Sequence, residues 1–106
     1  MVAERPGPVI QTIIADDEQL ARDELRFLLE SFPDIEILGT ASNGVEALDL
    51  IESAEPDLAF LDVEMPGLDG MGVIQKIRGK NHDLPYFVLA TAYEQSALQA
   101  FSLEAV

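Results

Sequence analysis

Three aspartates stand where predicted β-strands end. Asp16 and Asp17 follow the apolar segment VIQTIIA, and Asp62 follows PDLAFL. Because the carboxyl ends of neighbouring parallel strands meet at one edge of a sheet, we expect the three carboxylates to share a crevice there. Three negative charges held so close repel one another strongly unless a cation lies among them. The spacing therefore predicts a metal site before it predicts a reaction.

Each aspartate taken alone also has a simpler explanation. An Asp-Asp pair before a helix is often an N-cap whose charge interacts favourably with the helix dipole. A single Asp after a strand is commonly a turn residue. The pair and Asp62, however, follow the first and third predicted strands, which are neighbours in a doubly wound sheet of order 2-1-3-4. Chance capping does not explain that coincidence well.

Strands and helices alternate along the whole chain. Short apolar, β-branched segments predict strands, and apolar residues at helical spacing predict helices between them. Right-handed crossovers then give an α/β fold, a parallel sheet covered by helices on both faces. The predicted strands are residues 9–15, 35–40, 58–61 and 85–90; the predicted helices are 18–32, 45–54 after an Asn43-Gly44 turn, one N-capped by Asp69, and a fourth beginning near Ala97.

Composition narrows the class of protein further. The 106 residues suffice for one domain, and 48% of them are hydrophobic, which favours a packed core over disorder. The net charge of −14 makes direct nucleic-acid binding by this segment unfavourable. No apolar run is long enough to span a membrane, and the absence of cysteine suits the cytoplasm. Residues 1–8 are interpreted as a flexible leader.

The segments IIADDE, AFLDVEMPGLDG and VLATAY together resemble the receiver domain of bacterial two-component response regulators. The resemblance covers nearly the whole chain, so residues 9–106 are expected to form a receiver of flavodoxin-like fold. It implies that Asp62 is the phosphoacceptor, which takes a phosphoryl group from a sensor histidine kinase. It also implies a Mg²⁺ site in which Asp17 and Asp62 bind the ion, Asp16 binds it through water, and Glu64 contributes its backbone carbonyl.

The same resemblance assigns roles to residues around the acceptor. Thr91 ends the fourth predicted strand, where the family has the hydroxyl that bonds the new phosphoryl group. Judged without the resemblance, Thr91 is better explained as an ordinary β-branched strand residue. Ala92 is small and leaves room for the phosphoryl group. The Glu64 side chain and Tyr93 should flank the path of attack and tune hydrolysis.

Elementary chemistry supports these roles independently. Mg²⁺ prefers octahedral oxygen ligands and keeps several waters, so a few protein groups suffice to hold it. Phosphoryl transfer passes through a loose, highly charged transition state, and its catalysis is mostly positioning and charge neutralisation. An acidic pair beside Asp62 would therefore act by holding the cation. The expected protein is a phosphoacceptor regulator that assists its own phosphorylation and dephosphorylation, and not a turnover enzyme.

The sequence departs from the family at its end. Receivers have a fifth strand bearing a lysine that pairs with the phosphoryl group, followed by a fifth helix, and this sequence stops at Val106 before both. We therefore expect an incomplete receiver whose parent continues into an output domain. The segment TAYEQSALQAF is most like receivers joined to LytTR-type DNA-binding domains, which implies transcriptional control by the parent. An uncovered strand edge would also favour a homodimer or a strand-exchanged oligomer.

Two other function classes compete with this interpretation. A receiver fold could signal by binding alone, without phosphorylation; the missing lysine favours that reading and the intact acidic triad opposes it. A hydrolase related to haloacid-dehalogenase-like phosphatases could use Asp62 as its nucleophile. Those enzymes, however, carry an Asp-x-Asp motif where this chain has Glu64, and they need additional elements for which 106 residues leave little room.

Overall fold

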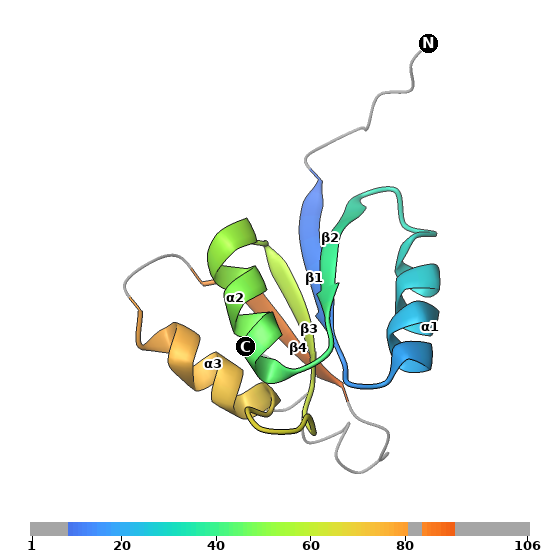
Figure 1. The fold of residues 1–106 in the computed structure, drawn as a ribbon. Helices are drawn as coiled ribbons and strands as arrows, with labels where there is room; N and C mark the ends of the chain where they lie inside the picture. Colours follow the sequence, from blue (N-terminus) through green and yellow to red (C-terminus); the bar gives the residue numbers. More distant parts are fainter. Residues whose placement is uncertain (1–8, 81–83, 91–106) are drawn as a thin grey trace.

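The computed structural model describes residues 9–80 and 84–90, which form three layers (Figure 1). A parallel sheet lies in the middle, with one helix on one face and two helices on the other. The elements are β1 (Ile10–Ala15), α1 (Gln19–Leu29), β2 (Ile35–Ala41), α2 (Gly44–Ala54), β3 (Leu58–Asp62), α3 (Gly70–Arg78) and β4 (Tyr86–Ala90).

The sheet has the order β2-β1-β3-β4, and all of its neighbouring strands are parallel. This confirms the predicted α/β class and the predicted 2-1-3-4 order. β1 is central and pairs with β2 on one side and β3 on the other, with a register shift toward β2 between Thr12 and Ile13. Because all four strands run the same way, their carboxyl ends meet at one edge.

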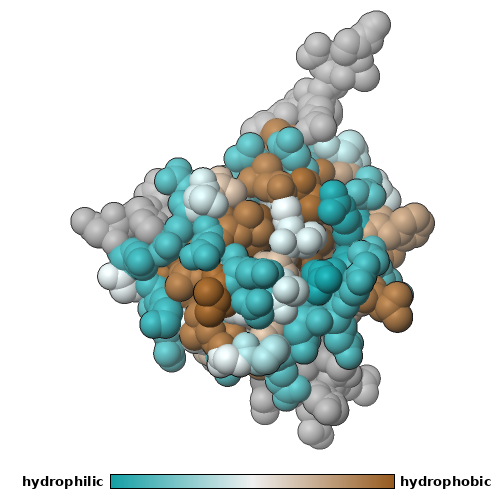
Figure 2. Space-filling model, viewed as in Figure 1, coloured by the Kyte–Doolittle hydropathy of each residue, from teal (hydrophilic) through white to brown (hydrophobic). Residues whose placement is uncertain are grey.

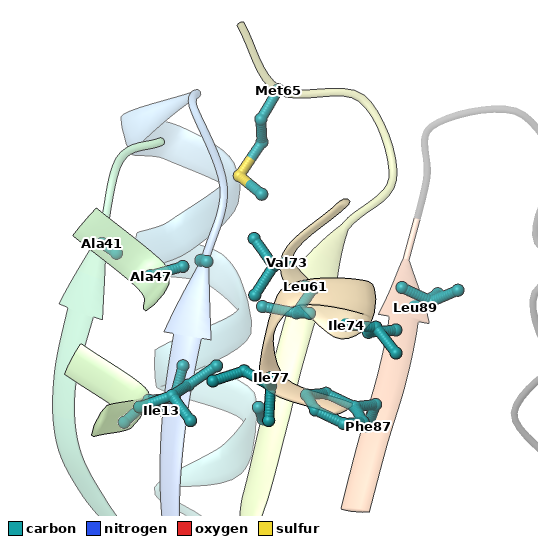
Figure 3. Packing of buried hydrophobic residues seen from close by; sticks show 13 residues of the cluster. Ile13, Ala41, Ala47, Leu61, Met65, Val73, Ile74, Ile77, Phe87 and Leu89 are labelled. Atoms are coloured by element: carbon teal, nitrogen blue, oxygen red, sulfur yellow. The ribbon is translucent and has the colours of Figure 1, made fainter. Parts of the chain in front are cut away.

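The main hydrophobic core lies between the sheet and the pair α2 and α3 (Figure 3). Alternate residues of β1, β3 and β4 point to this side, as the period of two along a strand requires, whereas β2 contributes only Ala41. Val73, Ile74 and Ile77 form the stripe of α3 that faces the sheet, where a fully buried aliphatic side chain contributes about 1.5–3 kcal/mol. The core comprises Ile13, Ala15, Ala41, Ala47, Ile51, Ala59, Leu61, Met65, Val73, Ile74, Ile77, Phe87 and Leu89.

The opposite face of the sheet is covered by α1, which buries Leu29. Other large apolar side chains of this helix remain exposed: Leu20 is 83% and Phe27 76% accessible. Figure 2 shows apolar atoms among hydrophilic ones on the outer side of the molecule where α1 lies. The outer surface of helix α1 therefore carries both apolar and polar side chains.

The predicted helix 18–32 is too long. In the structure α1 ends at Leu29, where the Ser31 and Phe32 N–H groups donate to the Leu28 and Leu29 carbonyls, three residues earlier, in place of the α-helical bonds to carbonyls four residues earlier. The Ser31 hydroxyl also donates to the Leu28 carbonyl at 2.7 Å. Phe32 follows in a turn and is 55% exposed, so it does not belong to the buried stripe. The apolar periodicity of the sequence therefore continues beyond Leu29, the last residue of α1. Pro33 sets only the outer limit.

The Asn43-Gly44 pair is also placed differently from the prediction. It is not a separate turn: Asn43 is the N-cap of α2, its side chain accepting from the Glu46 N–H at 2.8 Å, and Gly44 is the first helical residue. The strand bounds shift by one residue. β1 begins at Ile10, β4 begins at Tyr86, and Asp62 is the last residue of β3 where a following loop residue was expected.

Several predictions fall outside the described residues. These are the leader 1–8, the fourth helix near Ala97, the site residues Thr91, Ala92 and Tyr93, and the absence of a fifth strand and helix. Within the described ranges, no helix combines the length and the apolarity needed to cross a bilayer.

Candidate functional site

The three aspartates singled out from the sequence lie together. Ala15 of β1 pairs with Leu61 of β3, so Asp16 and Asp17 leave the sheet beside Asp62. One carboxylate oxygen from each of the three lies within 4.8 Å of the others. The expectation that these side chains converge at the carboxyl edge of the sheet is therefore correct.

The chemistry of this donor set fits a small hard cation. Mg²⁺ binds oxygen at about 2.1 Å, so opposite ligands in its octahedron lie roughly 4.2 Å apart. Carboxylate oxygens within 4.8 Å of one another can be bridged by one such ion, directly or with one water interposed. Asp16 and Asp62 are half-buried and Asp17 is exposed, so the site also leaves room for bound water. These three residues are the candidates for holding Mg²⁺.

An open pocket adjoins the cluster on the side of the β3–α3 loop. Two of the cluster's three aspartates, Asp17 and Asp62, line this pocket together with Glu64. Asp69 lines the same pocket, and its Oδ1 accepts from the Gly72 N–H at 2.8 Å as the N-cap of α3. The complete lining is Asp17, Glu18, Asp62, Glu64, Met65, Pro66 and Asp69.

Two close backbone approaches hold the β3–α3 loop. A Cβ at Gly70 would lie 2.5 Å from the Asp62 carbonyl oxygen, and a Cβ at Gly44 would overlap the Leu68 carbonyl. Only glycine allows α3 and α2 to begin so near this loop. Met65 adds a third anchor, since its side chain enters the core (Figure 3). The loop that follows Asp62 is thus fixed at both ends and in its middle.

Asp62 has a perturbed acidity. Desolvation at the end of β3, together with the nearby negative charges of Asp16 and Asp17, raises the pKa of the Asp62 carboxyl to about 6, although a hydrogen bond from the Glu64 N–H opposes the shift. A cation that neutralises the cluster would therefore stabilise the ionised form of the Asp62 carboxyl.

This shift predicts how the pH alters the stability of the metal-free protein. The Asp62 carboxyl titrates near 3.8 in the unfolded chain and near 6 in the fold, so the folded state binds more protons in between. Stability from this group is therefore present at acid pH and lost as the pH rises from about 4 to 6. After a discount for solvent screening, we expect Asp62→Asn to stabilise the metal-free protein by about 1 kcal/mol at neutral pH.

Urea unfolding with a chelator, at neutral and at acid pH, measures this difference. The variant lacks only the Asp62 carboxyl, so the comparison reports the pH dependence that this group brings to the acidic cluster. The advantage of Asp62→Asn should shrink as the pH falls through the window. An advantage of the same size at both pH values, or none at neutral pH, would contradict the raised pKa.

Sequence reasoning missed some residues of this edge. Glu18 and Asp69 line the pocket, but their sequence signals are those of ordinary helix starts, which capping explains fully. Arg22 reaches back to the Asp16 carbonyl at 2.7 Å, a contact that has no signature in residue spacing.

Comparison with known proteins agrees with the fold. The sequence profile described as "Response regulator receiver domain" matches residues 12–106. The chain is 40% identical to the transcriptional regulatory protein BtsR of Salmonella typhi over 93 residues, which cover 88% of this chain and 38% of BtsR. It is 41% identical to the sensory transduction protein LytT of Oceanobacillus iheyensis over 97 residues, 91% of this chain and 39% of LytT.

A solved structure is similar as well. The receiver domain of the response regulator NarL from Mycobacterium tuberculosis superposes with a TM-score of 0.76 at 31% identity, covering 89% of this chain and 79% of that domain. The predicted likeness to LytTR-type regulators is confirmed by the relatives BtsR and LytT, although this chain spans less than two fifths of either. By sequence, fold and the position of its acidic cluster, the chain belongs to the response regulator receiver domain family.

Proposed function

We propose that this chain is the phosphoacceptor module of a two-component system. In this role Asp62 takes a phosphoryl group from a sensor histidine kinase, with Mg²⁺ bound beside it. The observation that carries the proposal is the convergence of the Asp16, Asp17 and Asp62 carboxylates at the carboxyl edge of the sheet. A capping function for the aspartates gives no reason for oxygens from two strands to meet within 4.8 Å.

The proposed step is a displacement at phosphorus. A carboxylate oxygen of Asp62 forms a bond to phosphorus while the bond from phosphorus to the kinase's histidine nitrogen breaks, and the electron pair of that bond leaves with the imidazole. Asp62 must be ionised to attack, and the pKa of about 6 leaves it mostly ionised at neutral pH. The hydrogen bond from the Glu64 N–H to Asp62 Oδ1, 3.2 Å long, orients the carboxylate.

The neighbouring residues hold the cation in this proposal. Asp17 and Asp62 supply carboxylate oxygens, Asp16 acts through a water, and Glu64 adds its backbone carbonyl. When bound, Mg²⁺ neutralises the carboxylates and the charge that develops on the transferring phosphoryl group. Without such neutralisation the cluster would repel the incoming phosphate.

The remaining roles come from the family. Thr91 would donate its hydroxyl to a phosphoryl oxygen, Ala92 would leave the space for it, and Glu64 and Tyr93 would flank the path by which water later attacks phosphorus. Ala90, the last residue of β4, pairs in register with Asp62, so the strand that precedes Thr91 in the sequence ends beside the acceptor.

The names of two relatives suggest what phosphorylation of this module controls. BtsR is named a transcriptional regulatory protein and LytT a sensory transduction protein. We therefore expect phosphorylation to control a DNA-binding output domain of the LytTR type outside these 106 residues, in the cytoplasm. The net charge of −14 argues against DNA contact by this segment. Self-association as a homodimer or by strand exchange remains part of the proposal.

A phosphoryl analogue tests the proposal directly. With Mg²⁺, beryllofluoride should bind Asp62 and shift the amide resonances of residues around it, and a chelator should reverse the shifts. The analogue places an anionic, phosphoryl-like group on the acceptor without a kinase. Spectra that stay unchanged at saturating Mg²⁺ and beryllofluoride would refute the phosphoswitch and leave binding without phosphorylation as the better account.

A further inference from the structure

Arg22 makes an unusual contact beside the acidic cluster. It lies on the first turns of α1, half-buried, and its Nη1 donates a hydrogen bond of 2.7 Å to the backbone carbonyl of Asp16, six residues earlier. The side chain thus spans the whole β1–α1 turn. Hydrogen bonds from a charged donor are stronger than neutral ones, so this contact is well suited to hold the turn.

The bonded carbonyl belongs to the peptide group that joins Asp16 to Asp17. That group is planar, so fixing its oxygen also fixes the direction in which the chain enters Asp17. Two other hydrogen bonds hold Asp16 itself. The Asp16 N–H donates to the Ala41 carbonyl at 3.1 Å, and Asp16 Oδ1 accepts from the Glu18 N–H at 2.9 Å. Arg22 completes this set at the point nearest Asp17.

Arg22 holds the turn without occupying the carboxylates. Among the described residues the ion pairs are Arg26–Glu30 at 3.2 Å and Lys80–Glu52 at 2.7 Å, and neither involves the acidic cluster. In the part of the chain that the structure describes, no lysine or arginine side chain forms an ion pair with the cluster and so competes with a cation there. An arginine that paired with the carboxylates directly would compete with the metal.

The charge of Arg22 is directed partly toward α2. Two hydrogen bonds from Ser42 lower the pKa of Glu46, and the nearby Arg22 guanidinium lowers it further. Glu46 belongs to the capped start of α2 that follows β2. The Arg22 charge therefore also acts on Glu46 at the start of α2, while its hydrogen bond holds the turn after β1.

We propose that Arg22 is a positioning residue for the metal site, which sets the direction of the Asp17 carboxylate by holding the Asp16–Asp17 peptide. The inference rests on the proposed function, because it assumes that Asp17 binds Mg²⁺. It adds a residue that touches neither the metal nor the phosphoryl group.

The test compares the Mg²⁺ affinity of two variants that remove the same charge. Arg22→Met keeps the apolar stem and deletes the donor, and Arg26→Met does the same one turn later, where the arginine only pairs with Glu30 on the surface. The loss of one positive charge would by itself slightly tighten Mg²⁺ binding in both variants. Loss of positioning should instead weaken binding by about tenfold in Arg22→Met only. Calorimetric titration with Mg²⁺ measures both.

Two further measurements separate positioning from folding. Arg22→Lys retains a cationic donor and should recover part of the affinity. Urea unfolding in chelator should show that Arg22→Met is folded under the conditions of the titration. If Arg22→Met binds Mg²⁺ as tightly as Arg26→Met, the inference fails and the proposed function stands. If the unmodified protein binds no Mg²⁺, the proposed function itself fails.

Discussion

Asp62→Asn should abolish covalent phosphorylation. When the unmodified protein is incubated with Mg²⁺ and acetyl phosphate, its mass should rise by one phosphoryl group, and the variant should gain none. An amide nitrogen and a neutral amide oxygen are far weaker nucleophiles than a carboxylate, so the loss should be complete within detection. The side chain keeps its size, so the surrounding loop has no steric reason to move.

Asp69→Asn is the matched control for this experiment. Asp69 lines the same pocket and loses the same charge, and asparagine is as good an N-cap as aspartate, so α3 keeps its start. It should be phosphorylated like the unmodified protein. Labelling of Asp62→Asn, or loss of labelling in Asp69→Asn alone, would place the acceptor elsewhere in the pocket.

Asp17→Asn should remove most of the affinity for Mg²⁺. A carboxylate in contact with a divalent ion at a half-exposed site contributes about 3 kcal/mol, which corresponds to roughly 100-fold in the dissociation constant. Asp16→Asn should cost less, because its proposed contact runs through water. Calorimetric titration measures both variants, and phosphorylation by acetyl phosphate should fall in parallel with Mg²⁺ binding.

Asp23→Asn serves as the control for Asp17→Asn. Asp23 is an exposed residue of α1, and its loss changes the net charge equally. Its Mg²⁺ affinity should change by less than about twofold, because separated surface charges are strongly screened. Equal losses in Asp17→Asn and Asp23→Asn would mean that Mg²⁺ responds only to the overall acidity of the protein.

The fold could be predicted from the sequence because its signals are local and repeated. Alternation of short apolar segments with helical periodicity gives the element order, and right-handed crossovers then limit the topology. The convergence of Asp16, Asp17 and Asp62 followed from the same geometry, since parallel strands bring their carboxyl ends to one edge. The sheet order and the gathering of the three side chains both agree with the structure.

What the sequence could not supply depends partly on local hydrogen bonds at the ends of helices and partly on contacts between different elements. Local backbone hydrogen bonds from Ser31 and Phe32 end α1 at Leu29, although the apolar pattern extends to Phe32. The Asn-Gly pair favours turns in general, yet here Asn43 caps a helix. Desolvation of Asp62 and the reach of Arg22 to a backbone carbonyl both arise only when β1, β3 and α1 are assembled.

The position of the bound ion tests the central claim most directly. Mn²⁺ accepts the same oxygen ligands as Mg²⁺ and broadens the resonances of nearby amides. In a titration with small amounts of Mn²⁺, we expect selective broadening at residues 15–18 and 61–65, and excess Mg²⁺ should reverse it. Broadening that spreads over exposed acidic residues such as Asp23, Asp49 and Asp57, without preference for the carboxyl edge of β1 and β3, would contradict the account.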